Sequence, residues 1–208
     1  MDAARVTVVK LGGSYAHAAE LKPWLAAIAA CAGHVVLVPG GGPFADAVRE
    51  AQARMGFDDR VAHRMALTAM AQYGCALASL GHNLACAASV AAIGAALDER
   101  QVPIWSPAAM VLAADAISAS WDVTADSLAA WLAGQIAASR LLLVKRIRPA
   151  GASLRASDLV AQGVVDARFP EFLRASGAAA AIAGPADHAA ATAAIRSGSL
   201  CGTPIHMR

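Results

Sequence analysis

Charged residues are scarce in this 208-residue chain. Only 15% of its positions are Asp, Glu, Lys or Arg, and the formal net charge is +2. Aromatic residues make up 5% and do not interleave with the basic residues. A nucleic-acid interface needs a dense basic surface, and binding to an anionic membrane needs a basic cluster. The sequence therefore predicts neither a nucleic-acid partner nor a membrane partner.

Cysteines are few and dispersed. Cys31, Cys75, Cys86 and Cys201 lie far apart in the sequence and form no CxxC pair. Zinc sites and disulfide frameworks both depend on closer or more regular spacing. We predict neither, assign no metal-ligating residue, and expect buried thiols in a reducing cytoplasm.

Long runs of large apolar side chains are also absent. Alanine supplies much of the 58% hydrophobic content, and the longest weakly polar stretch, residues 74–97, contains His82, Asn83 and Ser89. A membrane span needs about twenty residues dominated by larger apolar side chains. The first residues pass directly into a strand-like run, without a secretory signal. We expect a cytoplasmic protein with a single domain over residues 1–208.

Short apolar runs alternate with helical stretches along the chain. The expected strands are 6–11, 35–38, 102–105, 110–112, 141–147 and 180–183, and the expected helices are 16–31, 44–55, 61–80, 83–97, 125–138 and 187–197. Strands that are apolar on both faces and separated by helices predict a mostly parallel sheet covered on both sides. Ligands of such sheets bind beyond the carboxyl ends of the strands. The segment 148–157, with Pro149 and Gly151, is the loosest by composition and is a candidate for a mobile loop over a ligand, which the sequence leaves open.

Two glycine clusters each follow a predicted strand and precede a predicted helix. They are Lys10-Leu11-Gly12-Gly13-Ser14 and Pro39-Gly40-Gly41-Gly42-Pro43. Residues without a Cβ let backbone N–H groups approach an anion, and the start of the next helix adds its positive end. The patterns GxxxxGK[ST] and GxGxxG are absent, which disfavours a P-loop NTPase and a Rossmann dehydrogenase. The two clusters together predict a phosphate or carboxylate site.

Lysine is the rarest charged residue, with only Lys10, Lys22 and Lys145. Lys10 lies inside the first glycine cluster, where an ammonium group can neutralise charge on a transferring phosphoryl group. Lys145 ends another apolar run, although Arg146 beside it is equally typical of a solvated basic loop. Lys22 precedes a proline in a helical region and is expected on the surface.

The segment Ser120-Trp121-Asp122-Val123-Thr124-Ala125-Asp126 leads into a predicted helix. Thr124 is expected to cap that helix, which places Asp126 in its first turn. Asp126 is then either a carboxylate that favours the helix dipole or a group that orients lysines at a reaction centre. The role of Asp46 also has two alternatives: it is either an acid in the first turn of its helix or a residue that contacts the substrate. His63 and His82 are expected to be partly buried, hydrogen-bonded histidines on alanine-rich helices.

These motifs, taken in order, resemble the amino acid kinase family, which includes acetylglutamate, aspartate, carbamate and uridylate kinases. The matching segments are Val9-Lys10-Leu11-Gly12-Gly13-Ser14, Val38-Pro39-Gly40-Gly41-Gly42, Thr124-Ala125-Asp126 and Gly202-Thr203. The resemblance covers nearly the whole chain. It implies a three-layer αβα sandwich around a mostly parallel sheet of about eight strands. It also implies the use of ATP, with Mg²⁺ held mainly through the ATP phosphates. The alanine-rich helices of residues 61–97 are suited to packing against a second subunit, so we expect a homo-oligomer.

Within the family the chain is most similar to a short branch associated with methanofuran-type cofactor synthesis. The similarity lies in Gly40-Gly41-Gly42-Pro43-Phe44-Ala45-Asp46, Ala62-His63-Arg64-Met65-Ala66, Ser120-Trp121-Asp122-Val123-Thr124 and Val165-Asp166. It implies phosphorylation of an aminomethyl-furanmethyl phosphate to the diphosphate. The other family acceptors, uridylate, acetylglutamate or carbamate, remain alternatives, as does a nucleotide- or oxyanion-binding protein without catalysis.

The resemblance implies a role for each matching position. Lys10 would stabilise the transferring phosphoryl group, and Asp126 would position Lys10. The positions that would hold ATP are Gly12, Gly13, Ser14 and Lys145. The positions that would hold the acceptor are Gly40, Gly41 and Gly42, with Asp46, Asp122 or Asp166 as partner for its ammonium group. The chain departs from many relatives because Lys145 is its last lysine, so a late catalytic lysine is missing. It also lacks a Thr-Asp pair after the strand that ends at Val144.

Overall fold

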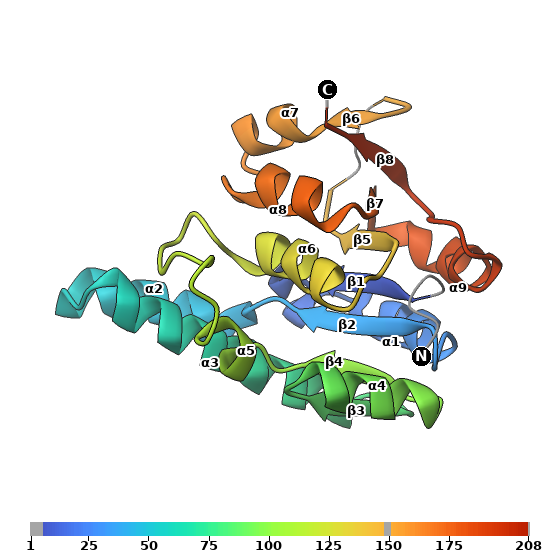
Figure 1. The fold of residues 1–208 in the computed structure, drawn as a ribbon, viewed down its shortest axis with the longest axis horizontal. Coiled ribbons are helices and arrows are strands. Elements are labelled where there is room, and N and C mark those ends of the chain that lie inside the picture. Colours follow the sequence, from blue (N-terminus) through green and yellow to red (C-terminus); the bar gives the residue numbers. More distant parts are fainter. Residues whose placement is uncertain (1–5, 148–150, 208) are drawn as a thin grey trace.

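The computed structural model describes residues 6–147 and 151–207, and its centre is one eight-stranded sheet in the order β3-β4-β2-β1-β5-β7-β8-β6 (Figure 1). The strands are β1 (Thr7–Leu11), β2 (Val35–Pro39), β3 (Leu84–Ala87), β4 (Val102–Trp105), β5 (Arg140–Val144), β6 (Leu154–Arg155), β7 (Ala179–Ala183) and β8 (Thr203–His206). Neighbours pair in parallel from β3 through β7, β8 runs antiparallel to β7, and β6 pairs in parallel with β8. The mostly parallel sheet predicted from the sequence is confirmed.

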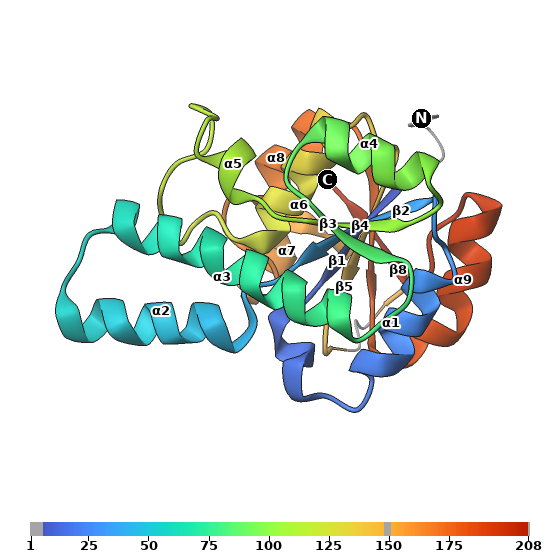
Figure 2. The same ribbon diagram turned by 90° about the horizontal axis from the view of Figure 1, so that it is seen from below.

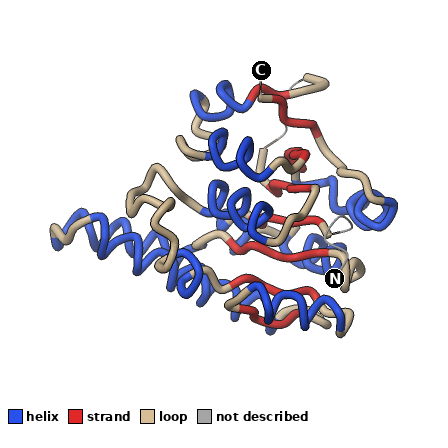
Figure 3. Tube along the Cα trace, viewed as in Figure 1, coloured by secondary structure: helices blue, strands red, loops and turns tan. Residues whose placement is uncertain are grey.

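Helices cover both faces of this sheet (Figure 3). The helices are α1 (Leu21–Ala29), α2 (Gly42–Met55), α3 (Asp59–Ser79), α4 (Val90–Asp98), α5 (Ala108–Val111), α6 (Ala125–Gln135), α7 (Ala156–Ala161), α8 (Phe169–Ser176) and α9 (His188–Ser197), with 3₁₀ turns η2 (Gly13–His17) and η3 (Pro185–Asp187). One hydrophobic core joins the sheet to α6 and α8, and a second joins its other face to α1 and α9. This is the predicted αβα sandwich. Within the described ranges, no helix combines the length and the apolar character needed to cross a membrane.

The alternation of side chains along β1 explains why the strand is apolar throughout. Val8 lies in the core beneath α6, whereas Val9 and Leu11 lie in the core beneath α1. Successive side chains of a strand point to opposite faces, so a central strand of a covered sheet needs apolar residues at consecutive positions. The same alternation decides which face each polar side chain at a strand end occupies.

α2 and α3 form an antiparallel pair that projects from the sheet (Figure 2). α2 begins three residues after β2 ends and stops at Gly56, whose φ of +76° is the left-handed conformation that glycine adopts without strain. α3 then begins after Asp58, whose side chain accepts a hydrogen bond from the Val61 N–H at 2.9 Å. The pair therefore extends from the carboxyl end of β2, where ligands of parallel sheets bind.

Several expectations about local structure were wrong or incomplete. Residues 83–97 form β3 and α4 rather than one helix, and residues 110–112 lie in and after the short helix α5 rather than in a strand. Of the segment 148–157, residues 148–150 lie outside the described residues, while the rest contains β6 and the start of α7. The sequence did not predict β6, β8, α7 or α8. Two of the four cysteines, Cys75 and Cys86, are exposed rather than buried.

Candidate active site

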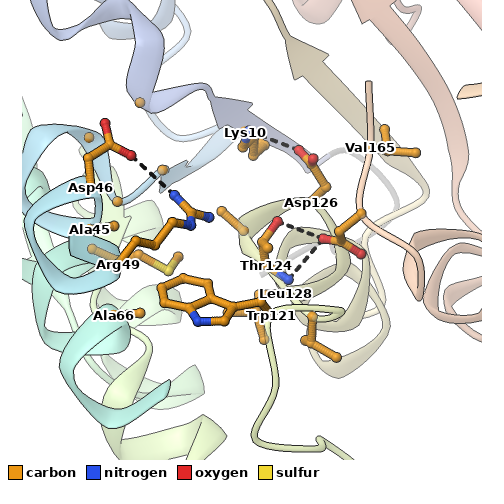
Figure 4. Close-up of a pocket in the computed structure, with 18 of the residues that line it drawn as sticks. Lys10, Ala45, Asp46, Arg49, Ala66, Trp121, Thr124, Asp126, Leu128 and Val165 are labelled. Carbon is orange, nitrogen blue, oxygen red and sulfur yellow. Dashed lines mark hydrogen bonds and ion pairs between the residues drawn. The ribbon is translucent and has the colours of Figure 1, made fainter. Parts of the chain in front are cut away.

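Lys10 and Lys145 lie on the same face of the sheet, because side chains two positions apart along a strand point to the same side. Lys10 lies on β1, two residues after Val8. Lys145 directly follows the neighbouring strand β5, two residues after Leu143. Val8 and Leu143 both lie in the core beneath α6. The first turn of α6 carries Asp126. Lys10 Nζ lies 2.8 Å from Asp126 Oδ1 (Figure 4), and Lys145 Nζ lies 2.6 Å from Oδ2. One carboxylate therefore joins the ends of two adjacent strands.

This group of three charges is largely removed from water. Asp126 is 4% exposed and Lys10 is 6% exposed. Burial alone would raise the pKa of Asp126, but the ammonium groups of Lys10 and Lys145 outweigh it and hold that pKa below its usual value. Burial, together with Lys10, lowers the pKa of Lys145 to about 8 against the opposing effect of Asp126. At neutral pH the group therefore carries a net positive charge that an anion can approach.

Asp166 fixes the N-terminus of α6 from a distant segment. Its Oδ2 accepts hydrogen bonds from the N–H of Thr124 (2.9 Å), the hydroxyl of Thr124 (2.8 Å) and the N–H of Ser127 (3.0 Å), and its Oδ1 accepts one from the Ser127 hydroxyl. Thr124 is the N-cap residue of α6, as predicted, but its side chain makes no capping hydrogen bond to the helix. Burial and the nearby charge of Asp126 raise the pKa of Asp166. Its carboxylate supplies the acceptors that the first turn of α6 needs.

The two glycine clusters meet at the carboxyl ends of β1 and β2. The first glycine of each cluster ties its loop to the next strand: Gly12 donates its N–H to the Val144 carbonyl (3.1 Å), and Gly40 donates to the Leu11 carbonyl (2.8 Å). Four further N–H groups have no hydrogen-bond acceptor in the described part of the chain: those of Gly13, Ser14, Gly41 and Gly42. Backbone N–H groups in such loops bind anions. Each loop thus has one N–H that holds its shape and two that can face a ligand.

A cavity of about 510 Å³ opens between these loops and the α2–α3 pair. Lys10, Lys145 and the glycine loops border it at the sheet, and most residues of the segments 120–128 and 163–166 complete its wall. α3 contributes a stripe of residues three or four apart, which are Asp59, His63, Ala66, Leu67 and Met70. Burial lowers the pKa of His63, so its imidazole is neutral at neutral pH. His63 is thus part of the cavity wall, and His82 is exposed in the turn before β3.

Most of the predicted site residues lie together in this wall. They are Lys10, Gly13, Ser14, Gly40, Gly41, Gly42, Asp46, Asp126 and Lys145. Gly12 is buried behind the loop, with its N–H already used. Asp46 stands at the rim, where its carboxylate pairs with Arg49 at 3.1 Å. Asp122 is exposed and does not belong to the wall, because the chain turns there to bring Val123 and Thr124 inward.

The sequence assigned no role to Arg49 or Trp121, which the structure brings together in the wall. The guanidinium carbon of Arg49 lies 4.3 Å from the centre of the Trp121 ring (Figure 4). Asp166 appeared in the sequence only as a partner for a substrate amine, whereas its carboxylate is occupied by α6. The available signal for Arg49 was its place one helical turn after Asp46. No local sequence pattern links Arg49 to Trp121.

Solved structures with the same fold include two uridylate kinases. The chain is 17% identical to the uridylate kinase of Archaeoglobus fulgidus, with a TM-score of 0.71 over 97% of this chain and 100% of that chain. It is 16% identical to the UMP kinase of Ureaplasma parvum, with a TM-score of 0.64 over 86% of this chain and 88% of that chain. At such identities the likeness establishes the fold.

Sequence comparison identifies the family. The chain is 26% identical over 180 residues to a (5-(aminomethyl)furan-3-yl)methyl phosphate kinase of Methanocaldococcus jannaschii. The match covers 80% of this chain and 82% of that protein. The model of the amino acid kinase family matches residues 5–148, more than half of the chain. The chain is therefore a phosphotransferase and belongs to the amino acid kinase family.

Proposed function

We propose that this phosphotransferase is an ATP-dependent kinase that converts 5-(aminomethyl)-3-furanmethyl phosphate to its diphosphate during synthesis of a methanofuran- or methylofuran-type cofactor. The observation that carries the proposal is the pairing of Lys10 and Lys145 with Asp126 beside two adjoining glycine loops. The choice of acceptor is supported by the relative from M. jannaschii, whose name states that activity.

The two glycine loops divide the phosphates between them in this proposal. The N–H groups of Gly13 and Ser14 would bind the phosphates of ATP, and those of Gly41 and Gly42 would bind the phosphate of the acceptor. Gly12 would act indirectly, because its N–H is bound to Val144 and maintains the loop. Donor and acceptor would then lie on adjoining loops, which would favour transfer through proximity.

The chemistry needs charge neutralisation more than proton transfer. An oxygen of the acceptor phosphate would bond to the γ-phosphorus of ATP as the bond to the βγ-bridging oxygen breaks, and ADP would leave. A phosphate is already ionised near neutral pH, so no general base is required. Lys10 and Lys145 would neutralise charge that builds up during transfer, and Asp126 would hold both ammonium groups in place. Lys145 would then substitute for the late catalytic lysine that the chain lacks.

Mg²⁺ would enter with ATP and neutralise phosphate charge. Among the described residues, no three His, Cys, Asp or Glu side chains gather around a common point, and Asp126 is already shared by two lysines. This donor set fits a metal ion that is held mainly by the nucleotide phosphates.

An acceptor assay tests the proposal directly. The purified protein is given ATP, Mg²⁺ and 5-(aminomethyl)-3-furanmethyl phosphate, ADP release is measured by a coupled assay, and phosphorus NMR identifies the product. We expect a new diphosphate, and no comparable ADP release with uridylate, acetylglutamate or carbamate. Turnover of one of those acceptors instead would reassign the substrate. ATP binding without ADP release for any acceptor would favour a protein that binds nucleotide without catalysis.

Replacement of Lys10 tests the reaction centre. Lys10→Ala should lower kcat by about 100-fold or more, because the lost charge acts on the transition state, while the KM values change much less. Lys22→Ala, on the exposed side of α1, is the matched control and should leave both parameters unchanged. Unchanged turnover in Lys10→Ala would remove Lys10 from the mechanism.

The proposal includes a cytoplasmic location and a homo-oligomer. Val61 and Met65 on α3 are 45% and 39% exposed, which supports packing of the 61–97 region against a second subunit. Light scattering of the purified protein measures the mass of the assembly, and a monomer at assay concentrations would contradict this part of the proposal.

A further inference from the structure

Arg49 is a third cation in the cavity wall, separate from the group formed by Lys10, Lys145 and Asp126. It lies on the second turn of α2, and helical side chains lean toward the N-terminus of their helix. Its guanidinium group contacts Asp46, one turn nearer the start of the helix, and Figure 4 shows it above Trp121. Arg49, Gly41 and Gly42 all line the same cavity, so an anion bound there can contact both the side chain and the loop.

The guanidinium group of Arg49 lies over the face of the Trp121 ring. The Arg49 Cζ atom lies 4.3 Å from the ring centre, a distance at which the cation interacts with the aromatic face. The ring is itself held, because Trp121 Nε1 donates to Gln52 Oε1 at 2.7 Å. Gln52 is fixed in turn by its amide nitrogen, which donates to Asp59 Oδ1 at 2.8 Å. A guanidinium group over an aromatic face can still donate its N–H groups to an anion.

The ion pair with the Asp46 carboxylate leaves most N–H donors of Arg49 available. It contacts a single nitrogen of Arg49, Nη1, at 3.1 Å, and its side chain is 76% exposed. Exposed pairs of this kind are weak, and a guanidinium group has five N–H donors. By contrast, both strand-end lysines already share the buried Asp126 carboxylate. Arg49 is therefore the cation of this wall with the most donors left for a ligand.

We propose that Arg49 binds the phosphate of the acceptor and determines the preference for a phosphate monoester, while Trp121 is a positioning residue that orients its guanidinium group. The inference rests on the proposed function and names the side chain that recognises the acceptor. The acceptor phosphate lies between the Gly41 and Gly42 N–H groups on one side and the Arg49 fork on the other. A guanidinium fork matches two phosphate oxygens, which fixes the direction of the attacking oxygen.

Kinetics with two varied substrates test the role of Arg49. Arg49→Gln should raise the KM of the acceptor about 30-fold or more, because a charge-assisted contact is lost, and should leave the KM of ATP within about twofold. Arg49→Lys should be intermediate, since it keeps the charge but not the planar fork. Arg54→Gln is the matched control, because Arg54 lies on the same helix, pairs with Glu50 and is outside the cavity wall. It should change neither KM.

A double-mutant cycle tests the role of Trp121. Trp121→Phe keeps an aromatic face but loses the bond to Gln52, so it should raise the KM of the acceptor by a smaller factor than Arg49→Gln. In the Arg49→Gln background the same change should add nothing, because Trp121 acts through Arg49. A merely structural role for Trp121 would give independent effects in the two backgrounds, and that result would overturn its assignment.

Equilibrium binding separates this inference from the proposed function. Calorimetry without ATP compares 5-(aminomethyl)-3-furanmethyl phosphate with the alcohol that lacks its phosphate. The original protein should prefer the phosphate, and Arg49→Gln should lose most of that preference. If the phosphate binds in this way but is not phosphorylated, the proposed function fails and the inference stands. If the acceptor is phosphorylated with an unchanged KM in Arg49→Gln, or if both ligands bind equally to the original protein, the inference is overturned.

Discussion

Gly13 and Gly42 meet so closely that a Cβ atom on Gly13 would lie 2.4 Å from the Gly42 nitrogen. The loop after β1 and the loop after β2 therefore pack backbone against backbone. Gly40 makes the reverse contact, since a Cβ there would lie 2.5 Å from the Gly13 nitrogen. Glycine is required at both positions because no side chain fits between the loops. Two sets of N–H groups are thereby brought into one cavity beside Lys10.

Gly13→Ala should separate these loops and damage both stability and activity. The added methyl group meets backbone atoms that have little room to move, so we expect a loss of about 2 kcal/mol in the free energy of unfolding. The kcat/KM should fall as well, because donor and acceptor would no longer be aligned. Urea denaturation and initial-rate measurements provide the two readouts.

Gly94→Ala is the matched control for that substitution. Gly94 lies inside α4, and a Cβ there would meet no atom within 4 Å. Alanine has the higher helix propensity, so this variant should gain up to about 1 kcal/mol and keep its activity. Equal stability of Gly13→Ala and the original protein would contradict the packing of the two loops.

Lys145 should give the enzyme an alkaline limit near pH 8. Its pKa is lowered to about 8, so raising the pH through that value removes one positive charge from the centre. The kcat/KM for ATP reports the free enzyme and should be level below pH of about 7 and fall above about 8. The decline in kcat should occur at higher pH, because bound phosphates favour the charged form of the lysine. Initial rates with varied ATP across this range test both statements.

Asp126→Asn tests whether deprotonation of Lys145 causes the decline in kcat/KM at a pH of about 8. Asp126 opposes the loss of the Lys145 proton, so its neutralisation should move the decline in kcat/KM to lower pH as well as reduce the rate. Asp158→Asn, which changes an exposed acid in the first turn of α7, should leave the profile in place. A decline at the same pH in Asp126→Asn would assign the limit to another group.

Much of the fold follows from local sequence pattern. β1, β2 and β5 are apolar at consecutive positions because both faces of the central sheet are covered, and that pattern is visible without a structure. The glycine clusters after β1 and β2 are equally visible. The helix expected over residues 83–97 includes β3 because the sequence of this strand, Leu-Ala-Cys-Ala, favours helix. The strand forms through its pairing with β4 at the edge of the sheet.

Much of the site depends on contacts that no local pattern contains. Lys10 and Asp126 could be predicted from motif and helix position, but their joint contact with Lys145 requires the neighbouring order of β1 and β5. The contact of Arg49 with Trp121 requires the loop before α6 to fold over α2. Such pairs lie far apart in the sequence and are fixed by tertiary packing. Sequence analysis therefore predicted the lysines of the cavity wall better than the contact between Arg49 and Trp121.

Asp166→Ala should destabilise the protein through the first turn of α6. Asp166 accepts hydrogen bonds from the N–H groups of Thr124 and Ser127, and their loss should cost about 2 kcal/mol in the free energy of unfolding. The kcat should fall too, because the same turn carries Asp126. Thermal and urea denaturation measure the first effect, and Asp166→Asn, which keeps one accepting oxygen, should recover part of it. Asp115→Ala, an exposed substitution, should change the stability by less than about 0.5 kcal/mol.

Cys75 and Cys86 should form a disulfide on mild oxidation, although the sequence alone gave no reason to pair them. Their Sγ atoms lie 3.9 Å apart on α3 and β3, and both residues are exposed. Cys31 and Cys201 are buried, and burial raises the pKa of both thiols, that of Cys201 to about 11. The thiolate is the reactive form, so these two should stay reduced.

Diamide is a suitable oxidant for this test, because it takes up the two thiol hydrogens as the sulfur–sulfur bond forms. Peptide mapping by mass spectrometry should find a cross-link between the peptides that contain Cys75 and Cys86. Burial and the neighbouring Cys75 raise the pKa of Cys86, so the reaction should accelerate as the pH rises. Cys75→Ser should abolish the intramolecular cross-link. A disulfide that involves Cys31 or Cys201 under these conditions would contradict both the contact between α3 and β3 and the burial of those two thiols.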